Sequence, residues 1–163
     1  MKRTVKVVAH NKHAKVLIKD NGDCYDLVAC EEVKLEPNRV HLISLGISMK
    51  LPSGCYARIY DRSSTPYKKG FHIANSVGIV DNSFCGDNDF WRYSALAIKT
   101  SKKDPLIIKE GDRICQFEIC LSQRATVWQK VKWFFTSGYK FEYVDSLGSK
   151  ERGGFGEGTQ ENK

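Results

Sequence analysis

The chain has 163 residues, of which 41% are hydrophobic and 28% charged, and its formal net charge is +7. This composition predicts one globular domain with a core of its own. The sequence contains neither the roughly 18 consecutive apolar residues of a membrane helix nor the apolar segment of a signal peptide. We therefore expect a cytoplasmic protein with no membrane partner. The positive charge predicts an anionic partner and leaves nucleic acid, nucleotide and phosphate open.

Most of the chain alternates between apolar and polar residues with a period of two, which is the pattern of half-buried strands. Residues 47–51 and 55–60 alternate on either side of Pro52-Ser53-Gly54, which predicts a β-hairpin. Further short strands are expected at 40–45, within 93–99 and 106–112, and at 113–121. Many short strands between Pro, Gly and Asp turns predict a sandwich, barrel or jelly roll.

The segment 126–138 departs from this pattern. Its apolar residues fall at helical spacing, and Thr126 and Gly138 are suited to begin and end a short helix; the apolar residues are Val127, Trp128, Val131, Phe134 and Phe135. Packing into the core is the expected role of this helix, and contact with a partner protein or a second subunit is the alternative. A membrane-surface helix is disfavoured because the polar face is short.

The six cysteines argue against a zinc site, because they form no Cys-x-x-Cys pair and lie near no histidine cluster. Free, partly buried thiols are expected. The last residues, 146–163, are rich in glycine and polar side chains and are expected to form a mobile arm. Within it, "RGGFG" carries a cation, Arg152, and an aromatic ring, Phe155, between glycines that let backbone amides approach an anion. Taken alone, this motif also suits an arginine-glycine tail for nucleic acid.

Three more stretches have the residue types of a phosphate or nucleotide site. In "DRSSTPYKKG", Arg62 offers a planar fork of donors, and Ser63 and Ser64 add hydroxyls, although a turn with a surface arginine explains them equally well. In "KEGDRICQFEI", Gln116 projects opposite the apolar face, where it is either a contact or a solvated residue. In "NSVGIVDNSFCGD", Asp81 follows an expected buried strand, and it is either functional or a turn residue that caps its own backbone.

The order of these stretches is more informative than any one of them. "NGDCYDL", "DRSSTPYKKG", "NSVGIVDNSFCGDNDFW", "EGDRICQFEI" and "RGGFGEG" together resemble the five motifs of the trimeric dUTP diphosphatases (dUTPases), in the family's order from Asn21 to Gly158. The run "GDNDFW", residues 86–91, is most similar to Bacillus-type and phage members. If a phage encodes the chain, the expected location is the host cytoplasm.

The resemblance implies an all-β fold, a distorted jelly-roll β-barrel over residues 1–145, with one short inserted helix at 126–138. It also implies a homotrimer in which each active site gathers motifs from more than one subunit. The C-terminal arm, residues 146–163, would cross onto a site formed mainly by neighbours.

The implied reaction is hydrolysis of dUTP to dUMP and pyrophosphate, assisted by Mg²⁺. Asp81 matches the general base that activates water. Backbone groups between Val77 and Phe84, including Gly78 and Ile79, would pair with uracil, Asn75 would bind it through water, and Phe84 would stack on the sugar. The phosphate contacts would be Arg62, Ser63, Ser64, Gln116 and Arg152, with Phe155 as a lid over the base and Asp26 holding water on the metal.

Three features depart from the family pattern. Glu157 follows the last motif where a small residue is usual, and its carboxylate would repel the γ-phosphate. Asp23-Cys24 stands in the first motif where small residues are common, and the helical segment 126–138 is an insertion.

Two rival functions remain open. A dCTP deaminase shares the fold and an Arg-Ser-Ser motif, but its chemistry needs a glutamate near the position of Trp91, and none lies between Asp81 and Thr100. A phage-type regulatory protein would bind a protein or nucleic-acid partner through the inserted helix and the basic face. Nucleic acid is not the expected partner of a dUTPase.

Overall fold

The computed structural model describes residues 1–19, 22–98 and 104–154. These residues form twelve strands, one short π-helical segment (η1) and one α-helix. In chain order the elements are β1 (Arg3–Ala9), β2 (Tyr25–Val28), β3 (Val33–Leu35), β4 (Val40–Ser44), β5 (Ile47–Lys50), β6 (Cys55–Asp61), η1 (Thr65–Lys69), β7 (Phe71–Ile73), β8 (Gly78–Val80), β9 (Arg92–Ala97), β10 (Leu106–Ile108), β11 (Arg113–Leu121), α1 (Val127–Phe134) and β12 (Tyr139–Tyr143). The expectation of a mostly-β protein is confirmed.

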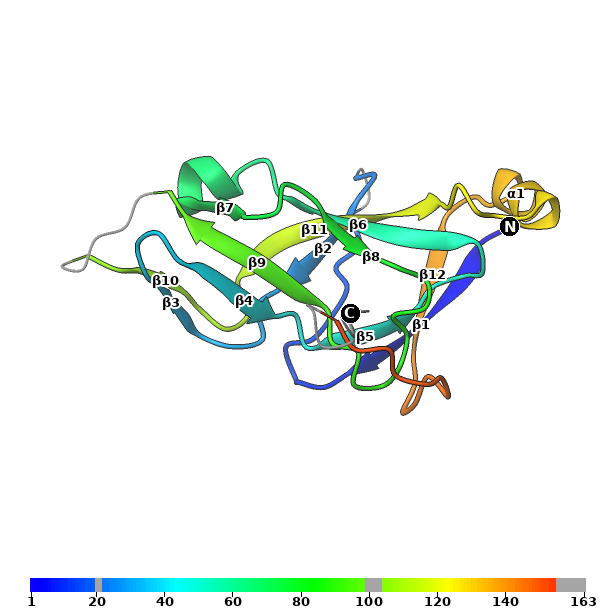
Figure 1. Ribbon diagram of the computed structural model, residues 1–163, viewed down its shortest axis with the longest axis horizontal. Helices are drawn as coiled ribbons and strands as arrows, with labels where there is room; N and C mark the ends of the chain where they lie inside the picture. Colours follow the sequence, from blue (N-terminus) through cyan, green and yellow to red (C-terminus); the bar gives the residue numbers. More distant parts are fainter. Residues whose placement is uncertain (20–21, 99–103, 155–163) are drawn as a thin grey trace, which may run out of the picture.

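The strands form four sheets, with the orders β2-β11-β6-β8, β4-β9-β7, β12-β1-β5 and β10-β3. The long strands β6 and β11 cross the middle of the molecule, β4 and β9 lie at one side, and β1 and β12 lie at the other (Figure 1). β11 has the predicted alternation, because Cys115, Phe117 and Ile119 are buried while Gln116 and Glu118 are half-buried. The ring of Phe117 lies 5.3 Å from that of Trp91, so β11 and the residue before β9 meet in the core.

The predicted hairpin of residues 47–51 and 55–60 is wrong. β5 pairs with β1, whereas β6 pairs with β11 and β8. The turn forms as expected, with the Cys55 amide donating to the Pro52 carbonyl at 3.0 Å, but it carries the chain from one sheet to another. Period-two alternation identifies the strands and says nothing about which strands pair.

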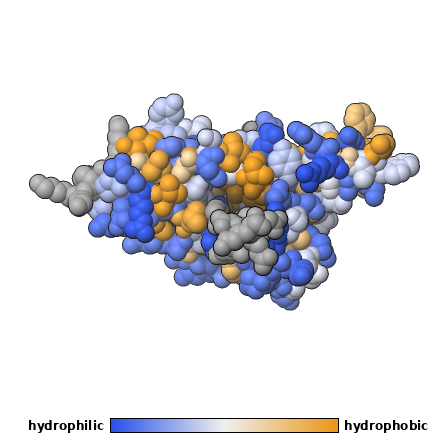
Figure 2. Space-filling view, in the orientation of Figure 1, coloured by the Kyte–Doolittle hydropathy of each residue, from blue (hydrophilic) through white to orange (hydrophobic). Residues whose placement is uncertain are grey.

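The predicted helix is present, and its role in the core is wrong. Thr126 caps α1 in a reciprocal capping box with Gln129, as expected, but the helix ends at Phe134 rather than near Gly138. No residue of α1 is buried, and Trp128 and Phe134 are 76% and 78% exposed. Hydrophobic side chains therefore gather on the surface at this end of the molecule (Figure 2).

Gln129 joins α1 to the rest of the chain by donating to the Ser53 hydroxyl at 2.6 Å. The N-terminal amine donates to the Phe135 carbonyl at 3.2 Å, so the start of the chain lies beside the helix (Figure 1). Among the described residues, no helix has the length and apolar character to cross a membrane.

Candidate active site

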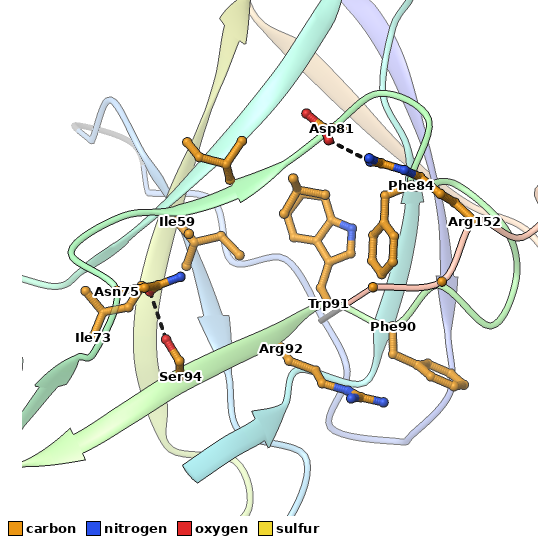
Figure 3. Close-up of a pocket in the computed structure, with 15 residues that line it drawn as sticks. Ile59, Ile73, Asn75, Asp81, Phe84, Phe90, Trp91, Arg92, Ser94 and Arg152 are labelled. Atoms are coloured by element: carbon orange, nitrogen blue, oxygen red, sulfur yellow. Dashed lines mark hydrogen bonds and ion pairs between the residues drawn. The ribbon is translucent and has the colours of Figure 1, made fainter. Parts of the chain in front are cut away.

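A cavity of about 540 Å³ opens beside β8, between the sheet that contains β6 and β8 and the sheet that contains β7 and β9. Six of the predicted site residues line it, namely Asn75, Gly78, Ile79, Asp81, Phe84 and Arg152. Figure 3 shows Asp81, Phe84 and Arg152 at one end of the cavity and Asn75 at the other. Val77 is half-buried and is not among the lining residues.

The strand before Asp81 is less buried than the sequence predicts. Val80 is buried, but Ile79 is 56% exposed, because β8 lies at the edge of its sheet and, among the residues that the structure describes, pairs only with β6. Asp81 follows directly, and its carbonyl accepts a 3.0 Å hydrogen bond from the Phe84 amide. The turn thus places Asp81 at the mouth of the cavity, with its side chain 55% exposed.

Asn75 lies in the loop between β7 and β8, which carries the chain between two sheets rather than closing a hairpin. The Ser94 hydroxyl donates to Asn75 Oδ1 at 2.8 Å. Because the oxygen is held in this way, the amide nitrogen is directed into the cavity (Figure 3). Asn75 is therefore a fixed hydrogen-bond donor on the cavity wall.

Sequence reasoning missed the side of the cavity formed around β9. The added lining residues are Ile59, Ile73, Phe90, Trp91, Arg92 and Ser94. Trp91 is 1% exposed, and its indole has no proton-transfer chemistry of the kind that a deaminase glutamate supplies. The alternation of residues 93–97 was visible in the sequence, but it does not tell which face of the strand borders a cavity.

A second cluster of predicted residues surrounds Asp26, whose side chain is fully buried. Asp26 Oδ2 lies 3.2 Å from Arg62 Nε, an ion pair whose N–H direction does not make a hydrogen bond. Gln116 is the cross-strand partner of Asp26 in the pairing of β11 with β2, so the two side chains share one face of the sheet. Lys19 Nζ lies 3.0 Å from Asp26 Oδ1, and Arg113 Nη1 lies 3.9 Å from Asp26 Oδ2. With Arg62, three cations therefore surround the Asp26 carboxylate.

The residues around Arg62 are fixed from several sides. Gln116 Nε2 donates to the Asp61 carbonyl at 3.0 Å, and the Asp61 carboxylate accepts from the Ile73 amide at 2.9 Å and from the Tyr93 hydroxyl. Burial, followed by this contact with Asp61, raises the pKa of Tyr93, so its hydroxyl stays a donor. Ser63 and Ser64 come next in the chain, exposed and half-buried respectively, where η1 begins.

The structure does not bring the two groups of residues together within one chain. Val80 pairs with Ala57 of β6, so Asp81 lies near the start of β6, whereas Arg62 follows its other end. Five to six residues of extended strand separate the two positions, which corresponds to roughly 20 Å. Arg62, Ser63, Ser64, Gln116 and Asp26 are accordingly absent from the cavity lining.

Arg152 is the predicted phosphate contact that the chain does bring to Asp81. Its Nη1 lies 2.6 Å from Asp81 Oδ2, and both side chains are about half exposed. Phe155 and Glu157, the predicted lid and the predicted repulsive residue, lie outside the described residues.

Comparisons with known proteins agree with the fold and with the resemblance found in the sequence. The family model described as dUTPase matches residues 14–131. The SPbeta prophage-derived deoxyuridine 5'-triphosphate nucleotidohydrolase YosS of Bacillus subtilis (strain 168) is 39% identical over 137 residues, which are 84% of this chain and 84% of that protein. The deoxyuridine 5'-triphosphate nucleotidohydrolase of Lactococcus lactis subsp. lactis (strain IL1403) is 30% identical over 118 residues, 70% of this chain and 79% of that protein.

Solved structures show the same fold. The dUTPase of Streptococcus mutans superposes with a TM-score of 0.66 at 18% identity, over 76% of this chain and 99% of that one. A variant of the dUTPase from phage phi11 of S. aureus, described as coordinating a structural Mg(II) ion, gives a TM-score of 0.64 at 19% identity, over 77% and 95%. The chain belongs to the dUTPase family.

Proposed function

We propose that the chain hydrolyses dUTP to dUMP and pyrophosphate, with Asp81 as the general base. The observation that carries this proposal is a carboxylate fixed at the mouth of a cavity whose far wall presents an oriented amide, Asn75. An exposed carboxylate in this position is suited to take a proton from water that attacks a phosphorus atom. Membership of the dUTPase family supports the choice of substrate.

The cavity supports recognition of uracil and deoxyribose. Gly78 and Ile79 place backbone groups along the cavity, and Val77 precedes them. A site that pairs the polar edge of uracil with fixed backbone groups rejects cytosine strongly, because mismatched polar groups are left unpaired. Phe84 offers a ring face to the sugar and lacks a hydroxyl of its own.

We infer that the active unit is a homotrimer of jelly-roll subunits. The support is the separation of roughly 20 Å between Asp81 and Arg62 in one chain, since one dUTP needs both a base and phosphate contacts. A neighbouring copy is the natural source of the cationic group, which comprises Arg62, Ser63, Ser64 and Gln116. These residues would position and neutralise the triphosphate.

The residues present fit Mg²⁺ that is bound mainly by the triphosphate. The described residues contain no group of three His, Cys, Asp or Glu side chains that suits a metal. Mg²⁺ seldom needs such a cage, because it keeps several waters and prefers phosphate oxygens. The Asp26 carboxylate oxygens have no hydrogen-bond partner among the described residues. They face Lys19, Arg62 and Arg113, so they would accept from metal-bound water where one of these cations turns to the phosphates. Mg²⁺ would supply further neutralisation of phosphate charge.

A nucleotide panel tests the proposed function. Pyrophosphate release should be rapid with dUTP in the presence of Mg²⁺ and at least about 100-fold slower with dTTP, dCTP and UTP, because each analogue misplaces or leaves unpaired a group in the cavity. Ammonia release from dCTP would instead identify a deaminase. Equal turnover of dUTP and dTTP would contradict the assigned base pocket.

As a second proposal, the protein regulates another molecule by binding it through residues 126–138. The exposed apolar side chains of α1, which include Trp128 and Phe134, favour contact with another protein. Salt-sensitive binding of nucleic acid without dUTP turnover would favour a binding protein over the enzyme.

A further inference from the structure

Asn82, to which the motif comparison gave no role, holds the turn that carries Asp81. Its side-chain amide nitrogen donates to three main-chain carbonyls, those of Pro52 at 2.9 Å, Cys55 at 3.0 Å and Leu51 at 3.3 Å. Because a carbonyl oxygen only accepts, these contacts need the amide nitrogen, and an ionised aspartate of the same size could make none of them. Asn82 is half-buried, so its hydrogen bonds are partly shielded from water.

The Asn82 side chain takes over where the backbone pairing of β8 ends. β8 pairs with β6 as far as Val80, whose partner is Ala57. Continued by two residues, this register sets Asn82 opposite Cys55, and there the side chain reaches the carbonyl of the facing strand. Asp81 therefore lies between two attachments to one segment, namely the strand pair at Val80 and the side-chain contact of Asn82.

The turn that Asn82 grips, residues 52–55, is itself held in place. Gly54 has a φ of +80°, a left-handed conformation that favours glycine. The Ser122 amide, directly after β11, donates to the Gly54 carbonyl at 2.8 Å. Asn82 thus ties the turn of Asp81 to a part of the chain that the central strand β11 supports.

We propose that Asn82 is the positioning residue for Asp81 and fixes the turn from which the carboxylate meets the attacking water. This role rests on the proposed function, because it assigns the residue that aims the general base. The Asp81 carbonyl accepts from the Phe84 amide, but that hydrogen bond lies within the turn and does not tie it to β6. Loss of the Asn82 contacts would let the turn move, and a displacement of about 1 Å at a catalytic group can cost about 10²-fold in rate.

The kinetics of Asn82→Ala measure the effect on the base. The change removes all three hydrogen bonds, so kcat for dUTP should fall about 10- to 100-fold. Affinity for a non-hydrolysable dUTP analogue should change less than about threefold, because Asn82 is absent from the cavity lining. Asn82→Asp keeps the size of the side chain and removes the donors, so it should lower kcat at least as far. Wild-type kcat in both variants would overturn the proposal.

The Asp81→Asn background separates positioning of the base from a general loss of structure. If Asn82 acts through the base, Asn82→Ala should lower the residual kcat of the Asp81→Asn protein by less than about threefold, since no base remains to be misplaced. An equal loss in both backgrounds would show that Asn82 acts on the whole site or fold, and the proposed role would be wrong.

Asn11→Ala is the matched control for the loss of an anchoring amide. Asn11 is also half-buried, and its side-chain nitrogen donates to the Cys30 carbonyl and to Glu110 Oε1, both at 3.1 Å and both outside the cavity lining. Urea unfolding should show losses of stability of the same order for both alanine variants, while only Asn82→Ala lowers kcat. A comparable fall of kcat in Asn11→Ala would mean that destabilisation alone explains the result and that Asn82 does not position the base.

Hydrogen exchange tests the contact without turnover. The Phe84 amide donates across the turn to the Asp81 carbonyl, so Asn82→Ala should speed its exchange about 10-fold relative to the Phe117 amide of β11. If the wild-type protein fails to release pyrophosphate from dUTP, the proposed function is wrong, and the exchange at Phe84 still decides whether Asn82 holds the turn. Unchanged exchange at Phe84 in the variant would refute that hold.

Discussion

The two ends of β6 differ in which parts of a nucleotide site a single chain supplies. At the end near Asp81, the chain supplies a cavity, an oriented amide and an arm that brings Arg152 to the base. At the end near Arg62, it supplies three cations that face one buried carboxylate, Asp26. The first end is suited to a base and a sugar, and the second to a polyanion, so the difference indicates a site shared between copies.

The aspartates at the two ends, Asp81 and Asp26, also differ in their surroundings and their expected roles. Asp81 is exposed and faces one arginine, so it is accessible to water and substrate. Asp26 is buried and faces Lys19, Arg62 and Arg113, so within the chain it orders the cations. Substitution of each aspartate by asparagine should therefore have a different principal effect.

The largest effect is expected for Asp81→Asn. Removing a general base should lower kcat for dUTP by about 10²- to 10⁴-fold. Nucleotide affinity should change little, because the exposed ion pair with Arg152 contributes at most about 1 kcal/mol. Steady-state kinetics and calorimetric titration with a non-hydrolysable dUTP analogue measure the two quantities. A fully active variant would show that the base is assigned wrongly.

Asp26→Asn should act mainly on stability and on triphosphate binding. Removing the charge takes the one buried partner from three partly exposed cations, which should cost about 1–3 kcal/mol of unfolding free energy. Urea unfolding of the variant measures this loss, and the matched control is Asp23→Asn, an exposed acid of the same segment. If both variants unfold at the same urea concentration, the cation cluster does not need Asp26.

The contact between Asp87 and the C-terminal arm at Ser146 and Leu147 should loosen in acid. The Leu147 amide, the Ser146 hydroxyl and the charge of His10 lower the pKa of Asp87 below its ordinary value. Because folding lowers the pKa of Asp87, its carboxylate stabilises the folded form at any pH above the ordinary aspartate pKa of about 3.9. This stabilisation is lost as the pH falls below about 3.9 and through the lowered pKa of the folded form. Hydrogen exchange of the Leu147 amide should therefore stay slow from pH 7 to about pH 4 and rise below that beyond the intrinsic trend. A flat protection profile to pH 2 would contradict the assigned contact.

The smallest effect is expected at α1, away from both ends of β6. Trp128→Ala should change the unfolding free energy by less than about 0.5 kcal/mol and leave turnover unchanged, because the side chain is 76% exposed. The core control Phe117→Ala should cost about 3–5 kcal/mol. A strongly destabilised or inactive Trp128→Ala would mean that α1 supports the fold or the site.

The sequence predicted the class of fold and one side of the cavity because these depend on local patterns. Alternation identified β6, β9 and β11, and the order of the motifs identified Asp81 and Asn75. Strand pairing was not predictable, because the turn at residues 52–54 is compatible with both a hairpin and a change of sheet. Lys19 and Arg113 were missed, because their contacts with Asp26 arise only where separate segments meet in space.

The most direct test of the shared site is the turnover of mixed trimers that contain Asp81→Asn and Arg62→Gln chains. Each variant alone should be nearly inactive. If Asp81 and Arg62 serve one substrate from different copies, random mixing should restore about a quarter of the wild-type sites. Mixed trimers as inactive as the separate variants would contradict the account.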